Sequence, residues 1–429
     1  MAGVDRMVQR AYVKCPICDK LYQLKVQLDK NISIFEWPIS FECKDCGEVL
    51  EYKYSNKGLQ PKEFEYKPVP EETPVTTLGY SSSLPITDEV YLKDLTYDQS
   101  LALFSNYMNL NRGYFAMEET SGFDYFLRRM QANLLPYREC LWSLLPFLKK
   151  GNAWAFSKKL AIIFDEKRYT PLDSTQKMYD AYFELIEKSH RNLMPGFYEQ
   201  NCYEAFVTPL NEYLSKVSGD EIRAIKEKLD KSGKISLWYK EEAVPCVARM
   251  LRDIQKLIPA MIYTSAGVSD VRQRGDLKIV TISCDDATDI YRDGYEVLCH
   301  GLKVFVGLNN LLTNGDMDAF TNPKFGNVST LAQFASLNGG KMLEHLENDA
   351  TVSCYLDGVM NNKIRNAASH SGGIEYDVMT QEVICHYDAK DDAKVYCTSL
   401  IEICHLSYLM LLHIMEITLM ARTIVEKAK

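Results

Sequence analysis

Residues 361–377 read NNKIRNAASHSGGIEYD and gather the chain's most chemically suggestive side chains. Arg365, Asn366 and His370 lie within six residues, and Ser371-Gly372-Gly373 follows them directly. Before this group, apolar residues recur at helical spacing, and a glycine pair commonly ends a helix. These apolar residues are Leu343, Leu346, Ala350, Tyr355, Val359 and Ile364. The pattern therefore predicts one helix that carries the three polar residues at its last turn.

The three side chains suit the cleavage of a phosphodiester. The partial negative charge at a helix C-terminus should raise the pKa of His370 from about 6.5, so that it can exchange a proton near neutral pH. Arg365 offers a planar, permanently charged group for a phosphate, and Asn366 can orient either neighbour. Because no carboxylate and no metal-ligand spacing accompanies them, an active site here would work without a metal. The alternative is a surface arginine and a capping histidine, since so short a motif also arises by chance.

The order of elements around the motif resembles the HEPN superfamily. Arg-Asn-x-x-x-His closes a helix, a glycine loop follows, two extended pieces cover residues 374–377 and 383–388, and a long apolar helix runs to the end. The resemblance covers roughly residues 285–426. It implies a helical bundle that cleaves RNA without a metal by attack of the 2′-hydroxyl, with two protomers bringing their motifs together. On this resemblance Arg365, Asn366 and His370 are the catalytic residues, and the protein is a toxin or an antiviral-defence effector.

A second motif lies near the start of the chain. Cys15-Pro-Ile-Cys18 and Cys43-Lys-Asp-Cys46 are two CxxC pairs separated by sequence typical of strands, and Gly47 eases the second turn. This spacing predicts a zinc ribbon in which Cys15, Cys18, Cys43 and Cys46 bind one Zn²⁺ tetrahedrally. Four thiolates leave no open position for water, so the metal should be structural. A redox CxxC or a chance pairing is the alternative. Through Pro70 the charges nearly balance, so a protein partner for the ribbon is at least as plausible as a nucleic acid.

Composition and the positions of proline and serine clusters suggest how the chain is divided into domains. Its 429 residues, 46% of them hydrophobic, suffice for two or three domains. Proline and serine clusters mark a polar tether around residues 61–86. We therefore expect a zinc ribbon at 1–60, a linker at 61–86, a helical middle domain at 87–275 and a HEPN-like helical bundle at 276–429. The fold class is mainly α, with one small β domain at the N-terminus.

The net charge of -9 argues against a broad basic surface, so RNA would need a local basic patch or a cleft formed by dimerisation. The first residues lack the apolar core of a secretory signal, and thirteen cysteines, an odd number, fit a reducing cytoplasm better than a disulfide framework. No uninterrupted apolar run approaches the ~20 residues of a membrane span. We expect a cytoplasmic protein that does not enter a membrane.

In the middle domain Asp173-x-x-Gln176 and Ser218-x-x-Glu221 predict helix starts, and none of the common catalytic motifs occurs. After it, residues 277–282 predict a strand and Thr330-x-x-Gln333 predicts a further helix start. Its densest basic stretch is formed by Arg128, Arg129, Lys149, Lys150, Lys158 and Lys159. A solvated face is one interpretation, and a surface that contacts RNA is the other. Trp142, Trp154 and Phe156 are more typical of a core than of base stacking. His190 is expected at an exposed helix end.

A last helix is expected from Val395 to Glu426, apolar nearly all round and buried, with part of it available to a second copy of the chain. His405 and His413 on it are expected to be core residues, whereas His386 could support the loop after His370.

The sequence thus predicts a metal-independent RNA endonuclease that leaves 2′,3′-cyclic phosphate ends. Its expected partners are an RNA substrate, a second protomer or a higher homo-oligomer, and a protein trigger or regulator. The alternative function is a non-enzymatic interaction protein that binds a nucleotide, a nucleic acid or a protein.

Overall fold

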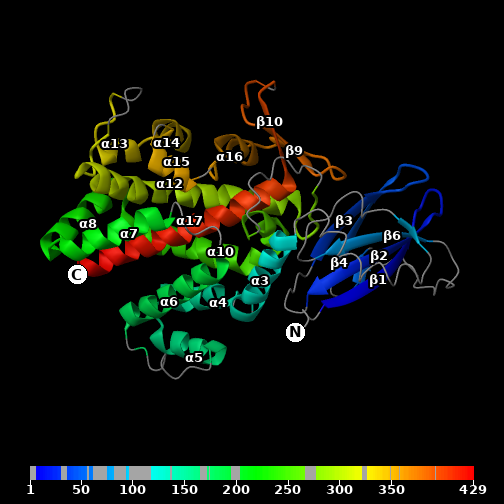
Figure 1. Cartoon of the computed structure of the whole chain (residues 1–429), viewed down its shortest axis with the longest axis horizontal. Coiled ribbons are helices and arrows are strands. Elements are labelled where there is room, and N and C mark those ends of the chain that lie inside the picture. Colours follow the sequence, from blue (N-terminus) through cyan, green and yellow to red (C-terminus); the bar gives the residue numbers. More distant parts are fainter. Residues whose placement is uncertain are drawn as a thin grey trace. The chain divides into compact units, whose positions relative to one another are not determined.

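A computed structural model shows a mostly helical chain with a few small sheets (Figure 1), which confirms the expected mainly α class at that level. The structure describes residues 6–29, 36–55, 58–60, 75–81, 93–95, 117–135, 138–164, 172, 174–194, 203–265, 277–320, 326–347, 349–356, 358–391 and 393–429.

Internal contacts divide the chain into two compact units, each assembled from three separate stretches. The sheet unit contains Met1–Leu135, Ile254–Asp289 and Asn366–His405, and the helix unit contains Pro136–Asp253, Ile290–Arg365 and Leu406–Lys429. The division into four consecutive domains, which the sequence suggested, stays a prediction.

The N-terminal part of the sheet unit contains two small sheets. One has the order β1-β2-β6-β7, formed by β1 (Arg6–Lys14), β2 (Leu21–Asp29), β6 (Val75–Ser81) and β7 (Lys93–Leu95). The other has the order β3-β4-β5, formed by β3 (Glu36–Glu42), β4 (Val49–Ser55) and β5 (Gly58–Gln60). Alternate residues of β2 and β3 share one buried cluster, because successive side chains of a strand point to opposite faces. The cluster includes Tyr22, Leu24, Val26, Ile39 and Phe41.

Strand β6 lies within residues 61–86, which were predicted to be a polar linker. It pairs in parallel with β2, and Leu78 joins the buried cluster. The many prolines of this stretch favoured a linker over a strand, although threonine, as at Thr76 and Thr77, is a residue type common in strands. Residues 61–74 and 82–92 of the predicted linker lie outside the residues that the structure describes.

The rest of the sheet unit contains α3 (Met117–Asn133), the 3₁₀ helix η4 (Ile254–Met261), α11 (Ile262–Ser265) and a sheet of order β10-β9-β8. Its strands are β8 (Ile374–Tyr376), β9 (Glu382–His386) and β10 (Val395–Ser399). Residues 277–282, expected to be a strand, contain an isolated bridge at Lys278 and no strand. Instead the side-chain amide of Gln381 accepts from the backbone N of Ile279 at 2.8 Å and donates to its carbonyl at 2.6 Å. One side chain thus supplies the backbone partners that a neighbouring strand would otherwise provide.

The helix unit contains a series of helices (Figure 1). They are α4 (Cys140–Lys149), α5 (Ala153–Phe164), α6 (Thr175–Leu193), α7 (Tyr203–Lys216), α8 (Gly219–Gly233), α9 (Ile235–Trp238), the π-helical turn η3 (Tyr239–Ala243), α10 (Val244–Asp253) and α13 (Leu331–Ala335). The predicted capping box at the start of α8 is confirmed, since Ser218 and Glu221 each bond the other's backbone N–H. The N-cap of α6 is Ser174 rather than the predicted Asp173.

Two long helices cross the boundary between the units, α12 (Cys284–Asn314) and α17 (Leu400–Lys427). Within the helix unit they lie side by side, and a Cβ on Gly294 would come within 2.7 Å of the Met410 sulfur. Glycine on α12 therefore permits this close approach. The last helix begins at Leu400 and not at Val395, because Val395–Ser399 pairs with β9 as a strand.

The single helix expected to deliver Arg365 is instead three short ones: α14 (Gly339–Leu346), α15 (Ala350–Leu356) and α16 (Asn362–Ser369). Asp349 caps α15 by accepting from the amides of Thr351 and Val352, and Gly358 adopts a left-handed φ of 72°. Asn361 then caps α16 by accepting from the amide of Lys363 at 2.9 Å. Apolar periodicity concealed both stops, because each of the three helices buries one of the predicted residues: Leu346, Tyr355 and Ile364.

The expected burial of α17 is confirmed. Among the described residues it is the one helix long and apolar enough to cross a membrane by length and composition, and 89% of its apolar window is buried. A buried core helix passes the same test, so this property is weak support for a membrane span.

A fully buried carboxylate lies within the helix unit. Glu416 is fully buried and bonds Tyr355 Oη at 2.7 Å, His413 Nδ1 at 3.1 Å and His190 Nε2 at 3.2 Å. His413 is therefore a core residue, as expected. His190 is only 6% exposed, which corrects its prediction as an exposed helix end. It lies 226 residues before its partner, so no local pattern could have revealed the pair.

Acid should weaken the protein through Glu416. Burial alone would raise its pKa, but hydrogen bonds from His190 and His413 outweigh burial and lower the pKa to about 2. A carboxylate with a depressed folded-state pKa stabilises the fold above its ordinary pKa of about 4.5, and this contribution is lost as the pH falls towards 2. We expect Glu416→Gln to be less stable at pH 7 and to lose less stability than the wild type between pH 4.5 and 2. Urea unfolding at several pH values measures this, and parallel curves for the two proteins would contradict it.

Candidate functional site

Helix α16 holds the motif by burying one of its faces. Ile364 and Ala367 are fully buried, whereas Arg365 and Asn366 are half-buried. His370 is exposed and lies directly after the last helical residue, with its amide bonded to the Ala367 carbonyl at 3.2 Å. The structure therefore places all three predicted residues at one short helix and its C-terminal end. The boundary between the two units falls between Arg365 and Asn366.

The glycine loop after His370 has a steric cause. Gly372 has a left-handed φ of 73°, and a Cβ on Gly373 would lie 2.3 Å from the Ala367 carbonyl oxygen. Only glycine fits both positions without moving the backbone. The Gly373 carbonyl also accepts from the amide of His386 at 2.8 Å. The loop is thus held against the end of α16 and against β9, which fixes the backbone that carries His370.

Arg365 has a carboxylate partner that the sequence analysis missed. Its Nε and Nη2 each lie 2.5 Å from Glu296 Oε1, and its guanidinium lies 5.9 Å from the ring centre of Tyr295. Glu296 is on α12, 69 residues earlier, and no local signal marks it. Both side chains are about a third or more exposed, so water screens the pair and its contribution to stability is about 0–1 kcal/mol. The pair therefore sets the position and the local charge of Arg365 more than it stabilises the fold.

His386, for which a supporting role was expected, pairs with a neighbouring strand. Its Nε2 lies 3.0 Å from Glu375 Oε1 on β8, close enough for an ion pair when the imidazole is protonated. Its backbone amide contacts the Gly373 carbonyl, so His386 is linked to the motif loop through the main chain. A role of its side chain in proton transfer stays a prediction.

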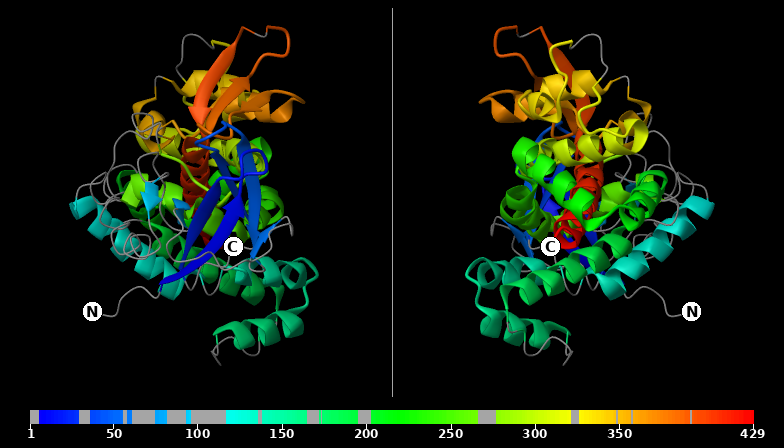
Figure 2. Two further views of the ribbon diagram at one scale, coloured as in Figure 1. Left: turned by 90° about the vertical axis from the view of Figure 1, so that its right-hand side faces the viewer. Right: turned by 90° about the vertical axis from the view of Figure 1, so that its left-hand side faces the viewer.

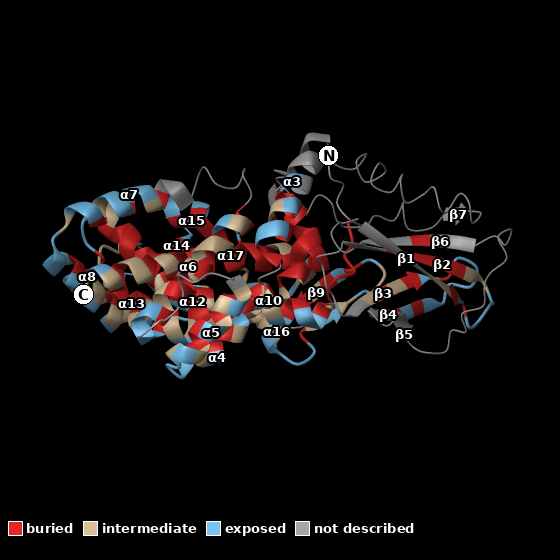
Figure 3. Ribbon diagram, turned by 90° about the horizontal axis from the view of Figure 1, so that it is seen from below, coloured by how far each residue is buried: buried red, intermediate tan, exposed pale blue. Residues whose placement is uncertain are grey.

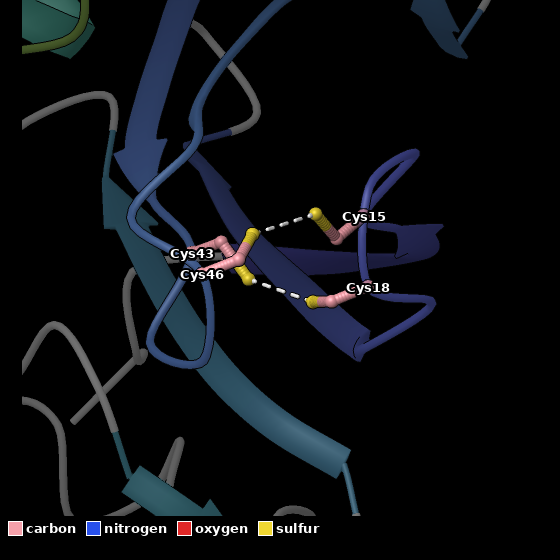
Figure 4. A group of neighbouring side chains, drawn as sticks. All are labelled: Cys15, Cys18, Cys43 and Cys46. Atoms are coloured by element: carbon pink, nitrogen blue, oxygen red, sulfur yellow. Dashed lines mark hydrogen bonds between the residues drawn. The ribbon is translucent and has the colours of Figure 1, made fainter.

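Four cysteine side chains in the N-terminal part converge on one point (Figure 4). The sulfur atoms of Cys15 and Cys46 lie 3.6 Å apart, those of Cys18 and Cys43 lie 3.4 Å apart, and all four lie within 4.8 Å of one another. Tetrahedral Zn–S bonds of about 2.3 Å require sulfur separations of roughly 3.8 Å. The predicted ligands thus form a plausible metal-binding site of the expected size.

The two knuckles that carry these cysteines share one backbone pattern. In the first, the Cys15 carbonyl accepts from the Asp19 amide at 3.0 Å, and in the second the Cys43 carbonyl accepts from the Gly47 amide at 2.8 Å. The residue after each CxxC is left-handed, with φ of 65° at Asp19 and 75° at Gly47. The turn that Gly47 was predicted to ease is present, and Asp19 adopts the same conformation without glycine.

The electrostatics of the cluster favour a bound cation. Burial would raise the pKa of Cys43, but a hydrogen bond from the Tyr22 hydroxyl at 3.1 Å helps to lower the pKa to about 6. The amide of Glu48 lowers the pKa of Cys46, but burial and the bond to Cys15 outweigh it and raise the pKa to about 12. A bound cation would favour the ionised form of both Cys43 and Cys46.

Other cysteines differ from the expectation of reduced thiols at one position. Cys354 on α15 is disulfide-bonded. Outside the cluster, free thiols are found among the described residues at Cys140, Cys246, Cys284, Cys299, Cys385, Cys397 and Cys404.

Comparison with protein-family models, with curated proteins and with solved structures finds no match to this chain.

Proposed function

We propose that the protein is a metal-independent endoribonuclease of HEPN type that leaves 2′,3′-cyclic phosphate ends. The observation that carries the proposal is the end of α16, where the exposed His370 directly follows a helix bearing Arg365 and Asn366. The glycine loop holds the backbone of this end against β9. The family resemblance of the motif supplies the reaction class.

In the proposed reaction His370 takes the proton of an RNA 2′-hydroxyl while the 2′-oxygen attacks the adjacent phosphorus. The bond from phosphorus to the 5′-oxygen breaks, and that oxygen receives a proton from the His370 of a second protomer in a homodimer. The products are a 2′,3′-cyclic phosphate and a 5′-hydroxyl. Arg365 stabilises the added negative charge at phosphorus, and Asn366 aligns the two side chains. A positioned acid or base of this kind contributes typically about 10²- to 10⁴-fold to the rate.

Glu296 would hold the proposed site in an inactive state. Its carboxylate neutralises Arg365, so an RNA phosphate has to compete for the guanidinium. A protein trigger or regulator that separated this pair would activate the enzyme. A cytoplasmic toxin or antiviral effector requires such restraint, and that biological role rests on the family resemblance.

The metal in the cysteine cluster is proposed to be a structural zinc ion, which makes the N-terminal part a zinc ribbon. Four sulfur ligands suit Zn²⁺ and leave no coordination position for a substrate. The zinc then organises β1 to β4 and takes no part in RNA cleavage.

The Arg365–Glu296 pair also supports a second candidate, a non-enzymatic interaction protein. In this second candidate, the ion pair with Glu296 has a purely structural role: Arg365 anchors α16 to α12 and does not bind a substrate. The zinc ribbon and the helix unit would then bind a nucleotide, a nucleic acid or a protein partner.

Cleavage of RNA in the presence of a chelator separates the two candidates. We expect the purified protein, incubated with a mixed-sequence single-stranded RNA and EDTA, to produce fragments with 2′,3′-cyclic phosphate ends, detected by mass spectrometry. Arg365→Ala should remove this activity, while Lys363→Ala, an exposed neighbour on the same helix, should retain it. Absence of cleavage under all conditions, including with Glu296→Gln to release Arg365, would leave the interaction protein as the function.

A further inference from the structure

Helices α4 and α5 present a face in which aromatic and basic residues are combined. Helix α5 buries Phe156 and Leu160 and turns Trp154, Lys158 and Ile162 outward at intervals of four residues. Trp154 is 73% exposed and Ile162 is 71% exposed, although the sequence pattern had suggested that Trp154 belongs to the core. Both views of Figure 2 show α5 at the outer edge of the helix unit, and Figure 3 shows exposed positions on both helices.

Helices α4 and α5 carry charge of one sign. From Cys140 to Phe164 the sequence contains four lysines and no acidic residue. The lysines are Lys149, Lys150, Lys158 and Lys159. Among the residues that the structure describes, none of these four is within ion-pair distance of a carboxylate, although the whole chain carries a net charge of -9. A concentrated positive patch on an acidic protein is a local attraction for an anionic partner.

The exposed indole indicates what kind of anion fits. Lys158 Nζ lies 5.1 Å from the centre of the Trp154 ring, so a cation and a flat aromatic surface occur together. Nucleic acid single strands are bound by this combination, in which bases stack on aromatic rings and lysines neutralise the phosphates. Trp154 and Ile162 are eight residues apart, or about 12 Å along the helix, which allows contact with more than one nucleotide.

We infer that the outer face of α5, together with Lys149 and Lys150 at the end of α4, is a docking surface for single-stranded RNA. This surface, defined by Trp154, Lys158, Ile162, Lys149 and Lys150, is called the α5 surface. It does not depend on the catalytic motif, because it rests on stacking and phosphate neutralisation. If the chain is a nuclease, the α5 surface supplies the local basic patch that an acidic protein needs to retain its substrate.

An anionic membrane is the competing occupant, and the arrangement of α5 disfavours it. The apolar side chains that could enter a bilayer, Phe156 and Leu160, are already buried in the protein. On α5 the large apolar side chains that stay exposed are Trp154 and Ile162. Lys158 lies between them on the same face, where a membrane-bound helix would need an apolar residue. Interfacial helices bind through a broad apolar face with their lysines on the opposite side. Two separated apolar residues are too few for that mode.

Binding is tested on the full-length protein carrying His370→Ala, so that cleavage does not consume the probe. Fluorescence anisotropy with a labelled 20-nucleotide single-stranded RNA gives the dissociation constant. Trp154→Ala should weaken binding by about 5- to 150-fold, the effect of losing one stacked base. Lys149→Ala combined with Lys158→Ala should lower the slope of log K against log salt by about 1.4, because each lost phosphate contact on a single strand removes about 0.7.

Matched controls lie elsewhere in the helix unit. Leu237→Ala removes another apolar side chain that is 54% exposed, and Lys216→Ala with Lys231→Ala removes two exposed lysines outside the α5 surface. Affinity should be unchanged in these controls, and thermal unfolding should show that all variants are folded. The inference is overturned if Trp154→Ala binds RNA like the parent protein. It is also overturned if the α5 variants lose binding only to vesicles containing phosphatidylserine. RNA binding without any cleavage by the wild type would reject the proposed nuclease and leave the α5 surface standing.

Discussion

Replacing His370 with alanine is expected to lower RNA cleavage by about 10²- to 10⁴-fold, the usual effect of losing a positioned acid or base. The side chain is exposed and follows the end of α16, so its removal leaves no cavity and should not change the melting temperature. The measurement is the initial rate of cleavage of a single-stranded RNA in the presence of EDTA. The loss should appear in kcat and not in KM, because the imidazole acts on the proton and not on binding.

His300→Ala is the matched control for this change. His300 is also exposed, but it pairs with Glu242 at 2.6 Å and lies outside the motif. Full activity in His300→Ala together with loss in His370→Ala would locate the chemistry at the end of α16. Undiminished cleavage by folded His370→Ala would reject the proposed reaction, whatever the behaviour of Arg365.

Cysteine replacement in the N-terminal cluster should have the largest effect on stability. Cys43→Ser removes a buried thiol of the cysteine cluster that also accepts a hydrogen bond from Tyr22. The binding free energy of a structural zinc ion in a small domain is about 10–16 kcal/mol, and it is mostly folding free energy. The small cluster around Tyr22, Leu24 and Phe41 cannot replace a contribution of that size. We expect Cys43→Ser to lose its zinc and the ordered structure of β1 to β4.

Two measurements check this prediction. Elemental analysis should find one zinc ion per chain in the wild type and less than a tenth of that in Cys43→Ser. Hydrogen exchange should show loss of amide protection in β1 to β4 and little change in α12 and α17. Cys397→Ser, which changes an exposed free thiol outside the cluster, is the control. Equal protection of β1 to β4 in both variants would show that the strands fold without the metal.

Local sequence signals predicted local structure well. The capping box of Ser218 and Glu221 and the cap of Thr330 on Gln333 are both present, because these bonds join residues only three apart. Apolar periodicity was less reliable between residues 343 and 369. It correctly marked Leu346, Tyr355, Val359 and Ile364 as buried, but Leu343 is half-buried and Ala350 is exposed. It also could not show that Asp349, Gly358 and Asn361 interrupt the helix. Residues 277–282 were similar: their β-branched composition suits an extended backbone, but the pairing partner turned out to be the side chain of Gln381.

The sequence by itself indicated the cysteine cluster and the α16 motif, because their residues lie close together along the chain, the cysteines within each CxxC pair. The spacing within each CxxC pair brings its two sulfur atoms close together, so the fold had only to bring the two pairs together. The motif on α16 spans only six residues. The tertiary structure alone decided that Glu296 pairs with Arg365, that His190 meets Glu416 and that Trp154 faces outward. The physical reason is that periodicity shows which face of a helix is apolar, whereas the identity of a distant partner depends on packing between elements that sequence spacing does not encode.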